Sequence, residues 1–125
     1  MSRPMMVPSP AHPISVVPTQ SRVVVKVDGK TVADTTAALT LQEASYPAVQ
    51  YIPMADVDQS LLRRTETTSY CPFKGDASYY TIATSDRELP DAVWSYETPY
   101  PAVDVIAGYV AFYPQRVELT IGDDN

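Results

Sequence analysis

The chain has 125 residues, of which 45% are hydrophobic and 19% charged, and its formal net charge at pH 7 is −6. This length supports one hydrophobic core, so we expect a single domain. The basic residues are scattered and offer no basic face for nucleic acid. Apolar runs fall short of the roughly 18 residues that a membrane span needs. We therefore expect a water-soluble protein that binds neither nucleic acid nor membranes.

Residues 1–21 are expected to form an extended, proline-rich N-terminal arm, ahead of a single β-rich domain over 22–125. The arm contains five of the twelve prolines, and these interrupt every apolar stretch that could serve as a secretory signal. The single cysteine, Cys71, agrees with a reducing compartment. We therefore expect a cytoplasmic protein whose arm docks in part on the domain or on a second subunit.

Four strands are expected in the first half of the domain. A β-branched run precedes an Asp28-Gly29 hairpin signal, and later segments alternate apolar and polar residues or end at Pro53. These features predict strands over residues 23–27, 31–35, 38–43 and 49–52.

The second half is expected to hold further strands and one or two short helices. Pro53 and Pro101 lie at first-turn positions and predict short helical pieces over 54–62 and 101–107. A polar stretch at 63–69 follows the first piece. Aromatic and β-branched residues predict strands over 77–83, 92–96, 109–113 and 116–121. About eight short strands indicate a mainly β fold: a bent antiparallel sheet, a sandwich or a partly open barrel.

Several kinds of chemistry have no residues to support them. The only histidine, His12, lies in the arm, so we expect the folded domain to lack the imidazole of a hydrolase triad. One cysteine and one histidine also exclude a Cys/His zinc site within one chain. Asp56 and Asp58 could pass for a nucleotidyltransferase metal pair, but the chain lacks the Gly-Ser turn of that chemistry, and a helix start favours aspartate anyway. We expect no cofactor. The sequence does not exclude a Mg²⁺ or Ca²⁺ site built only of carboxylates, but we assign no metal ligands.

A resemblance to a known family is concentrated at residues 70–80, which run Tyr-Cys-Pro-Phe-Lys-Gly-Asp-Ala-Ser-Tyr-Tyr. This stretch resembles the signature of a bacterial domain-of-unknown-function family, number four-two-seven, sometimes labelled nucleotidyltransferase-like. Similar blocks are Val-Ala-Asp-Thr at 32–35, Tyr-Ile-Pro at 51–53, Trp-Ser-Tyr at 94–96 and Ala-Phe-Tyr-Pro at 111–114. The likeness spans about residues 12–121 and implies a small β-rich fold, an arm that packs from about residue 12, and no assigned activity. Where many members carry histidine, this chain has Thr67 and Tyr109, which puts in doubt any family mechanism that needs those imidazoles.

The segment Cys-Pro-x-Lys-Gly at 71–75 is expected to form a turn. Proline fixes φ and glycine permits positive φ, so Cys71 and Lys74 should share one short loop. A lysine three residues from a thiol can activate it as a nucleophile. The alternatives are that Cys71 is a small buried hydrophobe and that Lys74 forms an ion pair with Asp76 or Glu66.

Nine tyrosines and one tryptophan are many for a chain of this length. Alternation along a strand puts Trp94 and Tyr96 on one face of a sheet, and it puts Tyr79 and Tyr80 on opposite faces. Polar-tipped rings suit a ligand groove or a protein interface, although the rim of a core is their commoner place.

Three functions remain open. The leading hypothesis is a non-enzymatic binding or interaction module that we expect to be a homodimer, with an aromatic-lined groove for a small anionic ligand. Its candidate ligand-binding residues are Arg63, Tyr70, Lys74, Asp76, Trp94 and Tyr96. The first alternative is an enzyme with Cys71 or Lys74 as nucleophile, acting without histidine or zinc. The second is a structural domain that assembles through strand edges or the arm.

Overall fold

The computed structural model describes residues 5–122, which form ten strands and three short 3₁₀ helices. The strands are β1 (Ile14–Pro18), β2 (Val23–Val27), β3 (Lys30–Thr35), β4 (Leu39–Glu43), β5 (Val49–Pro53), β6 (Leu62–Cys71), β7 (Gly75–Ala83), β8 (Glu88–Ser95), β9 (Tyr109–Phe112) and β10 (Glu118–Ile121). The helices are η1 (Met54–Asp56), η2 (Gln59–Leu61) and η3 (Pro101–Ile106). The prediction of a mainly β fold with short helices is confirmed.

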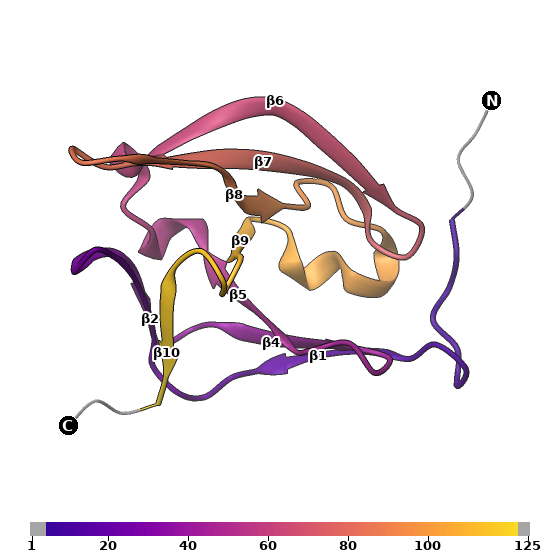
Figure 1. The fold of residues 1–125 in the computed structure, drawn as a ribbon. Coiled ribbons are helices and arrows are strands. Elements are labelled where there is room, and N and C mark those ends of the chain that lie inside the picture. The colour runs from indigo at the N-terminus through magenta and orange to yellow at the C-terminus, as the bar shows by residue number, and fades with distance from the viewer. Residues whose placement is uncertain (1–4, 123–125) are drawn as a thin grey trace.

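The strands form two antiparallel sheets. The larger has seven strands in the order β1-β4-β5-β9-β8-β7-β6, and the smaller has three in the order β10-β2-β3. In Figure 1 the large sheet bends so that β1 and β4 form a lower layer and β6 and β7 an upper one. β5 and β9 join the two halves through only two residue pairs, Ile52 with Val110 and Pro53 with Tyr109. The sheet is therefore bent and does not close into a barrel.

The main core lies between the small sheet and one face of the large one. The predicted Asp28-Gly29 hairpin joins β2 to β3, with positive φ at both turn residues. Alternation along β2 buries Val23, Val25 and Val27 against large-sheet residues, which include Ile52, Ile82, Val93 and Val110.

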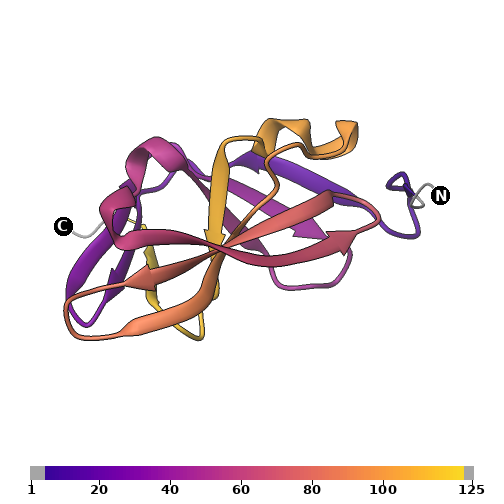
Figure 2. The same ribbon diagram turned by 90° about the horizontal axis from the view of Figure 1, so that it is seen from above.

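A second cluster occupies the opposite face of the large sheet. It contains Leu41, Tyr51, Ala77, Tyr96, Val103, Ile106 and Ala111, and η3 supplies two of these side chains. The register pairs Tyr79 with Trp94 and Trp94 with Ala111, so these three side chains share this face. Seen from above, the β6–β7 hairpin crosses the molecule, and the two ends of the described chain lie at opposite sides (Figure 2).

Two segments differ from the sequence prediction. Residues 63–69, expected as a polar stretch between elements, belong to the ten-residue edge strand β6, which exposes most of its side chains and therefore has no buried face for a pattern to reveal. Residues 14–18, expected to lie in an extended arm, pair with β4 as β1. Pro18 fits there because β1 is an edge strand.

No helix in residues 5–122 combines the length and apolar character needed to cross a membrane.

Candidate functional site

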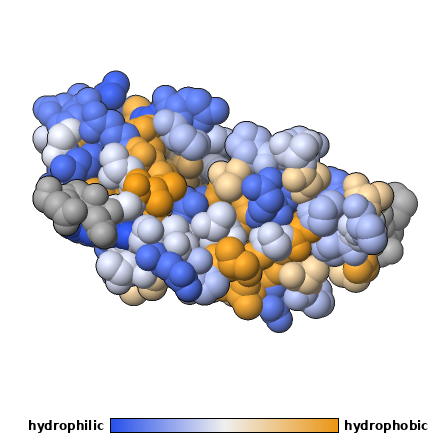
Figure 3. Space-filling view, turned by 90° about the horizontal axis from the view of Figure 1, so that it is seen from below, coloured by the Kyte–Doolittle hydropathy of each residue, from blue (hydrophilic) through white to orange (hydrophobic). Residues whose placement is uncertain are grey.

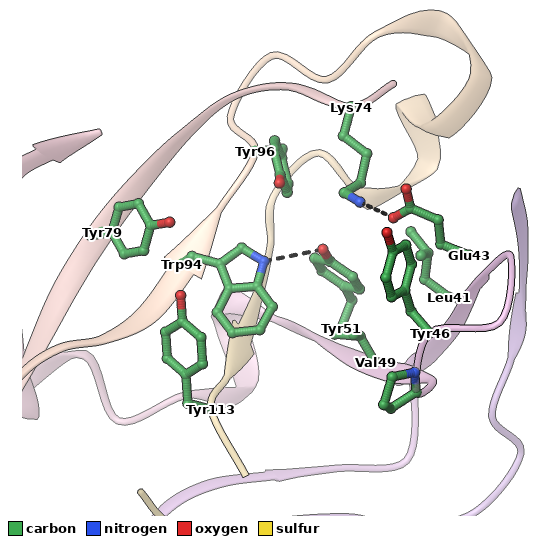
Figure 4. Close-up of a pocket in the computed structure, with 11 residues that line it drawn as sticks. Leu41, Glu43, Tyr46, Val49, Tyr51, Lys74, Tyr79, Trp94, Tyr96 and Tyr113 are labelled. Carbon is green, nitrogen blue, oxygen red and sulfur yellow. Dashed lines mark hydrogen bonds and ion pairs between the residues drawn. The ribbon is translucent and has the colours of Figure 1, made fainter. Parts of the chain in front are cut away.

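A cavity of about 190 Å³ lies on the face of the large sheet opposite the main core. One wall comes from β4, β5 and the loop between them. The other comes from the β6–β7 turn, β7, β8 and the residues that follow β8 and β9 (Figure 4). Its aromatic residues are Tyr46, Tyr51, Tyr79, Trp94, Tyr96 and Tyr113. Leu41, Pro47 and Val49 are its apolar residues, and Glu43 and Lys74 are its charged ones.

Strand alternation explains which aromatic residues reach the cavity. Trp94 and Tyr96 both line it, as the sequence predicted. Tyr79 also lines it, whereas Tyr80 packs against the main core, so the prediction that these neighbours face opposite ways is confirmed.

Trp94 is fixed by two aromatic neighbours. Its Nε1 donates a hydrogen bond of 3.2 Å to the hydroxyl of Tyr51, whose ring meets the indole edge-on at a centroid distance of 6.5 Å. The ring of Tyr113 lies 4.5 Å from the indole on a tilted plane. A side chain held by packing and a hydrogen bond gives the cavity one rigid wall.

Glu43 lies between two basic side chains at the edge of the cavity. Lys74 donates to its Oε1, and His12 Nε2 lies 2.8 Å from its Oε2. The Glu43 and Lys74 side chains are only 14% and 11% exposed. Burial by itself would raise the pKa of Glu43, but the hydrogen bonds from Lys74 and His12 outweigh it and lower the pKa below its usual value. Glu43 is therefore ionised at neutral pH and accepts from both neighbours.

His12 is part of the packed structure. Its ring stacks on Phe73 with centroids 4.1 Å apart and planes at 4°, and it meets Tyr46 edge-on. The expectation that the folded domain lacks an imidazole because His12 lies in the arm is therefore wrong. The pairing of β1 with β4, which sets Ile14 opposite Glu43, brings His12 to the site.

The sequence analysis missed Glu43 as well as His12. A signal for Glu43 was present, because it ends an alternating strand and shares a face with Leu39 and Leu41. No such signal existed for His12, since its position depends on a strand register.

The structure brings together three of the six predicted ligand-binding residues. Lys74, Trp94 and Tyr96 line the cavity, and Arg63, Tyr70 and Asp76 lie outside it. Arg63 pairs with Glu88 on the surface, and the hydroxyl of Tyr70 is 2.7 Å from that of Tyr100. Asp76 lies opposite Tyr70 in the β6–β7 pairing and is exposed.

The two candidate nucleophiles lie in different surroundings. Half-buried Cys71 packs against the second cluster and does not line the cavity. Lys74 pairs with Glu43, so the expected ion pair with Asp76 or Glu66 is wrong.

The family to which the chain belongs follows from its sequence. The family model described as Domain of unknown function (DUF427) matches residues 15–123, which include every residue that lines the cavity and both sheets apart from Ile14. The chain is a member of the DUF427 family, which confirms the resemblance seen in the sequence. No curated protein matches the chain.

The aspartates that resembled a nucleotidyltransferase pair have structural partners in this DUF427 domain. Asp56 accepts a hydrogen bond of 2.7 Å from the hydroxyl of Thr35. Asp58 accepts from the backbone N–H and the hydroxyl of Ser60 and thereby caps η2. Across residues 5–122, no three or more histidine, cysteine, aspartate or glutamate side chains gather in a way that could hold a metal ion.

Three of the tyrosines that line the cavity of the DUF427 domain have raised pKa values. Burial raises the pKa of Tyr51 and of Tyr96 well above the usual value. Burial and the neighbouring Tyr79 raise the pKa of Tyr113 to about 12. Tyr96 is only 6% exposed, and its hydroxyl has no hydrogen-bond partner within residues 5–122. Figure 4 shows this hydroxyl directed into the cavity.

An alkaline titration of the native protein should reflect this burial. Tyr51 and Tyr96 should stay protonated near pH 11, so the phenolate absorbance should fall short of nine tyrosines and the missing part should appear on unfolding. Because the folded pKa values are raised, unfolding should also become easier as pH rises above the usual tyrosine value. A native protein that shows all nine phenolates at pH 11 would contradict the prediction.

Proposed function

We propose that this DUF427 domain is a binding module that takes a small anionic ligand in the aromatic cavity. The observation that carries the proposal is the hydroxyl of Tyr96, which belongs to a side chain that is only 6% exposed and faces the cavity without a hydrogen-bond partner among residues 5–122. Within residues 5–122 no buried side-chain nitrogen or oxygen lacks a partner, so this hydroxyl is accessible from the cavity. A ligand oxygen in the cavity could therefore accept a hydrogen bond from it.

The hydrogen-bond donors around the cavity favour an anion. Lys74 is its one basic lining residue, and an ammonium group has three donors, of which Glu43 engages one. The charge of Glu43 is balanced by that of Lys74, which leaves the other donors of the ammonium group to a ligand. The hydroxyls of Tyr79 and Tyr113 and the ammonium group of Lys74 also lie at this cavity, where they can donate to a carboxylate or phosphate.

The volume of the cavity limits the size of what it binds. At about 190 Å³ it is smaller than the pockets that hold drug-sized ligands, which measure about 300–1,000 Å³. It therefore suits a single carboxylate or phosphate group with few further atoms.

The geometry supports an enzyme less well. The nitrogen of Lys74, as an ammonium ion paired with Glu43, has no lone pair with which to attack a substrate. Cys71 does not line the cavity. An enzyme with either residue as nucleophile would need the ion pair to break or the cavity wall to open.

Homodimer formation and a cytoplasmic location also remain proposals. The location is supported by the single cysteine. The dimer is supported by the exposed apolar side chains of Met5, Met6 and Val7, which border an apolar cavity beside Tyr100 and Pro101. Sedimentation of the full chain as a monomer at high concentration would overturn the dimer.

The substitution Tyr96→Phe tests the ligand proposal, because it removes only the hydroxyl. We expect the affinity for acetate or phosphate to fall about tenfold, the value of one hydrogen bond to a charged group. Chemical-shift titration of the cavity residues measures this affinity. Tyr70→Phe is the matched control, since its hydroxyl contacts Tyr100 outside the cavity, and it should bind as the wild type does. The absence of shifts at the cavity with any small anion would overturn the proposal.

A further inference from the structure

A second cavity, of about 280 Å³, adjoins the first. Val49 and Trp94 line both cavities, so the indole is a wall that they share. The other apolar residues of the second cavity include Phe112, Leu119 and Ile121. The two cavities are therefore neighbours that meet at these two side chains.

The second cavity exists because β5 and β9 separate. Their pairing ends after Ile52 with Val110 and Pro53 with Tyr109. Towards Val49 on one strand and Phe112 on the other, the two strands no longer share hydrogen bonds, and the second cavity lies between them. β10 closes its far side through Leu119 and Ile121.

The two adjoining cavities differ in chemistry. The first has the ion pair of Glu43 and Lys74 and a set of tyrosine hydroxyls, whereas no charged residue lines the second. Ile121 is 53% exposed at the rim of the second cavity. Figure 3 shows apolar patches that interrupt the polar surface on the side of β1, β4 and β10. A polar cavity beside an apolar one suits a ligand with two unlike ends.

We infer that the ligand is an amphiphile, an organic carboxylate whose alkyl or aryl tail passes Trp94 into the second cavity. This inference rests on the proposed function, because the carboxylate occupies the anion site beside Lys74 and Tyr96. The tail contacts the indole, Val49 and the side chains of β10, which are apolar surfaces that it removes from water. Taken together, the two volumes reach the size of an ordinary small-molecule pocket.

A series of straight-chain carboxylates tests the inference on the full chain. From acetate to hexanoate, we expect the affinity to rise about fourfold for each methylene group, which is the fold-change for burial of one methylene. Chemical shifts of Val49 and Ile121 should respond to hexanoate and not to acetate. Hexan-1-ol, which has the same tail and no charge, should bind at least tenfold more weakly than hexanoate.

The substitution Ile121→Ser tests the binding of the tail separately from the binding of the carboxylate head. Because Ile121 is half exposed and lies in the second cavity only, the variant should fold, bind acetate as the wild type does, and lose most of the gain with chain length. Val105→Ser is the matched control, since Val105 is equally exposed and borders neither cavity.

The possible outcomes distinguish the two proposals. If acetate binds and longer tails add nothing, or if Ile121→Ser keeps the full gain, the amphiphile is wrong and the anion site stands. If no carboxylate binds but phosphate does, the amphiphile is wrong and the anion site stands; if neither binds, both proposals fail. Equal affinity for hexanol and hexanoate contradicts a charged head. A second copy of the chain on Ile121 would appear as a dimer that Ile121→Ser dissociates and hexanoate does not affect, and it would overturn the inference.

Discussion

Glu43→Gln is expected to lower the free energy of unfolding at pH 7 by about 3 kcal/mol, the lower end of the cost of removing one partner from a buried ion pair. The substitution keeps the size of the side chain and leaves Lys74 as a charge that is 11% exposed without its carboxylate. The hydrogen bond to His12 also weakens, because an amide oxygen is a poorer acceptor than a carboxylate. Denaturant unfolding followed by tryptophan fluorescence measures the change.

Two controls separate the ion pair from other effects. Glu88→Gln breaks the surface pair with Arg63, whose side chains are 59% and 60% exposed, and should cost less than about 1 kcal/mol. The double variant Glu43→Leu with Lys74→Met replaces both charges by apolar groups and should recover most of the stability. If the double variant is as unstable as Glu43→Gln, the unpaired charge on Lys74 is not the cause.

The same carboxylate should make stability depend on acidity. The pKa of Glu43 is lower in the folded protein than in the unfolded chain, so its contribution is complete above the unfolded value and is lost as pH falls through the folded value. The difference in stability between the wild type and Glu43→Gln should therefore shrink as pH is lowered from 6 towards 3. Asp34 and Asp91, whose pKa values are also lowered, act equally in both proteins and cancel in this difference.

Local patterns predicted much of the fold. The valine run, the Asp28-Gly29 turn and the prolines at 53 and 101 each specify a conformation through their own backbone preferences, and the structure has a hairpin and two helical pieces there. Edge strands were harder, because β1 and β6 bury little and therefore show weak alternation. The bend of the large sheet depends on the short pairing between β5 and β9, which no local pattern encodes.

The site was predicted only in part, because it too depends on pairing between distant strands. Trp94 and Tyr96 were assigned to one face by alternation, and Lys74 was placed by its turn. Arg63, Tyr70 and Asp76 were chosen because they are near Lys74 in sequence, but neighbours on a hairpin point to different faces. Glu43 and His12 are 31 residues apart, and the pairing of β1 with β4 brings them together. The sequence therefore predicts only some of the residues of a site that is assembled from distant strands of a bent sheet.

The turn that carries Lys74 gives the second large effect. Gly75 has a φ of +108°, outside the left-handed values near +57° that asparagine and aspartate adopt. A Cβ at this position would lie 3.6 Å or more from its neighbours, so space is available and only the backbone conformation resists substitution. Gly75→Ala should therefore lower the free energy of unfolding by about 2 kcal/mol.

We expect the strain at Gly75 to change the position of Lys74 in the cavity, because backbone hydrogen bonds hold the turn at Lys74. Its N–H donates to the carbonyl of Cys71, and its own carbonyl accepts from Tyr100. To relieve an unfavourable φ, Gly75→Ala must rotate the peptide that holds Lys74, which moves the ammonium group away from Glu43. Affinity for acetate should then fall along with stability, and the loss of stability at low pH that depends on Glu43 should diminish.

Gly29→Ala is the matched control for Gly75→Ala. Gly29 has a φ of +83° with no atom near its Cβ position, and it lies in an exposed hairpin turn away from the cavity. We expect it to cost about 1 kcal/mol and to leave anion binding unchanged. If both alanine variants bind acetate equally well, the position of Lys74 does not depend on the conformation of its turn. A loss of binding confined to Gly75→Ala would instead show that one glycine links the stability of the β6–β7 hairpin to the charge that receives the ligand.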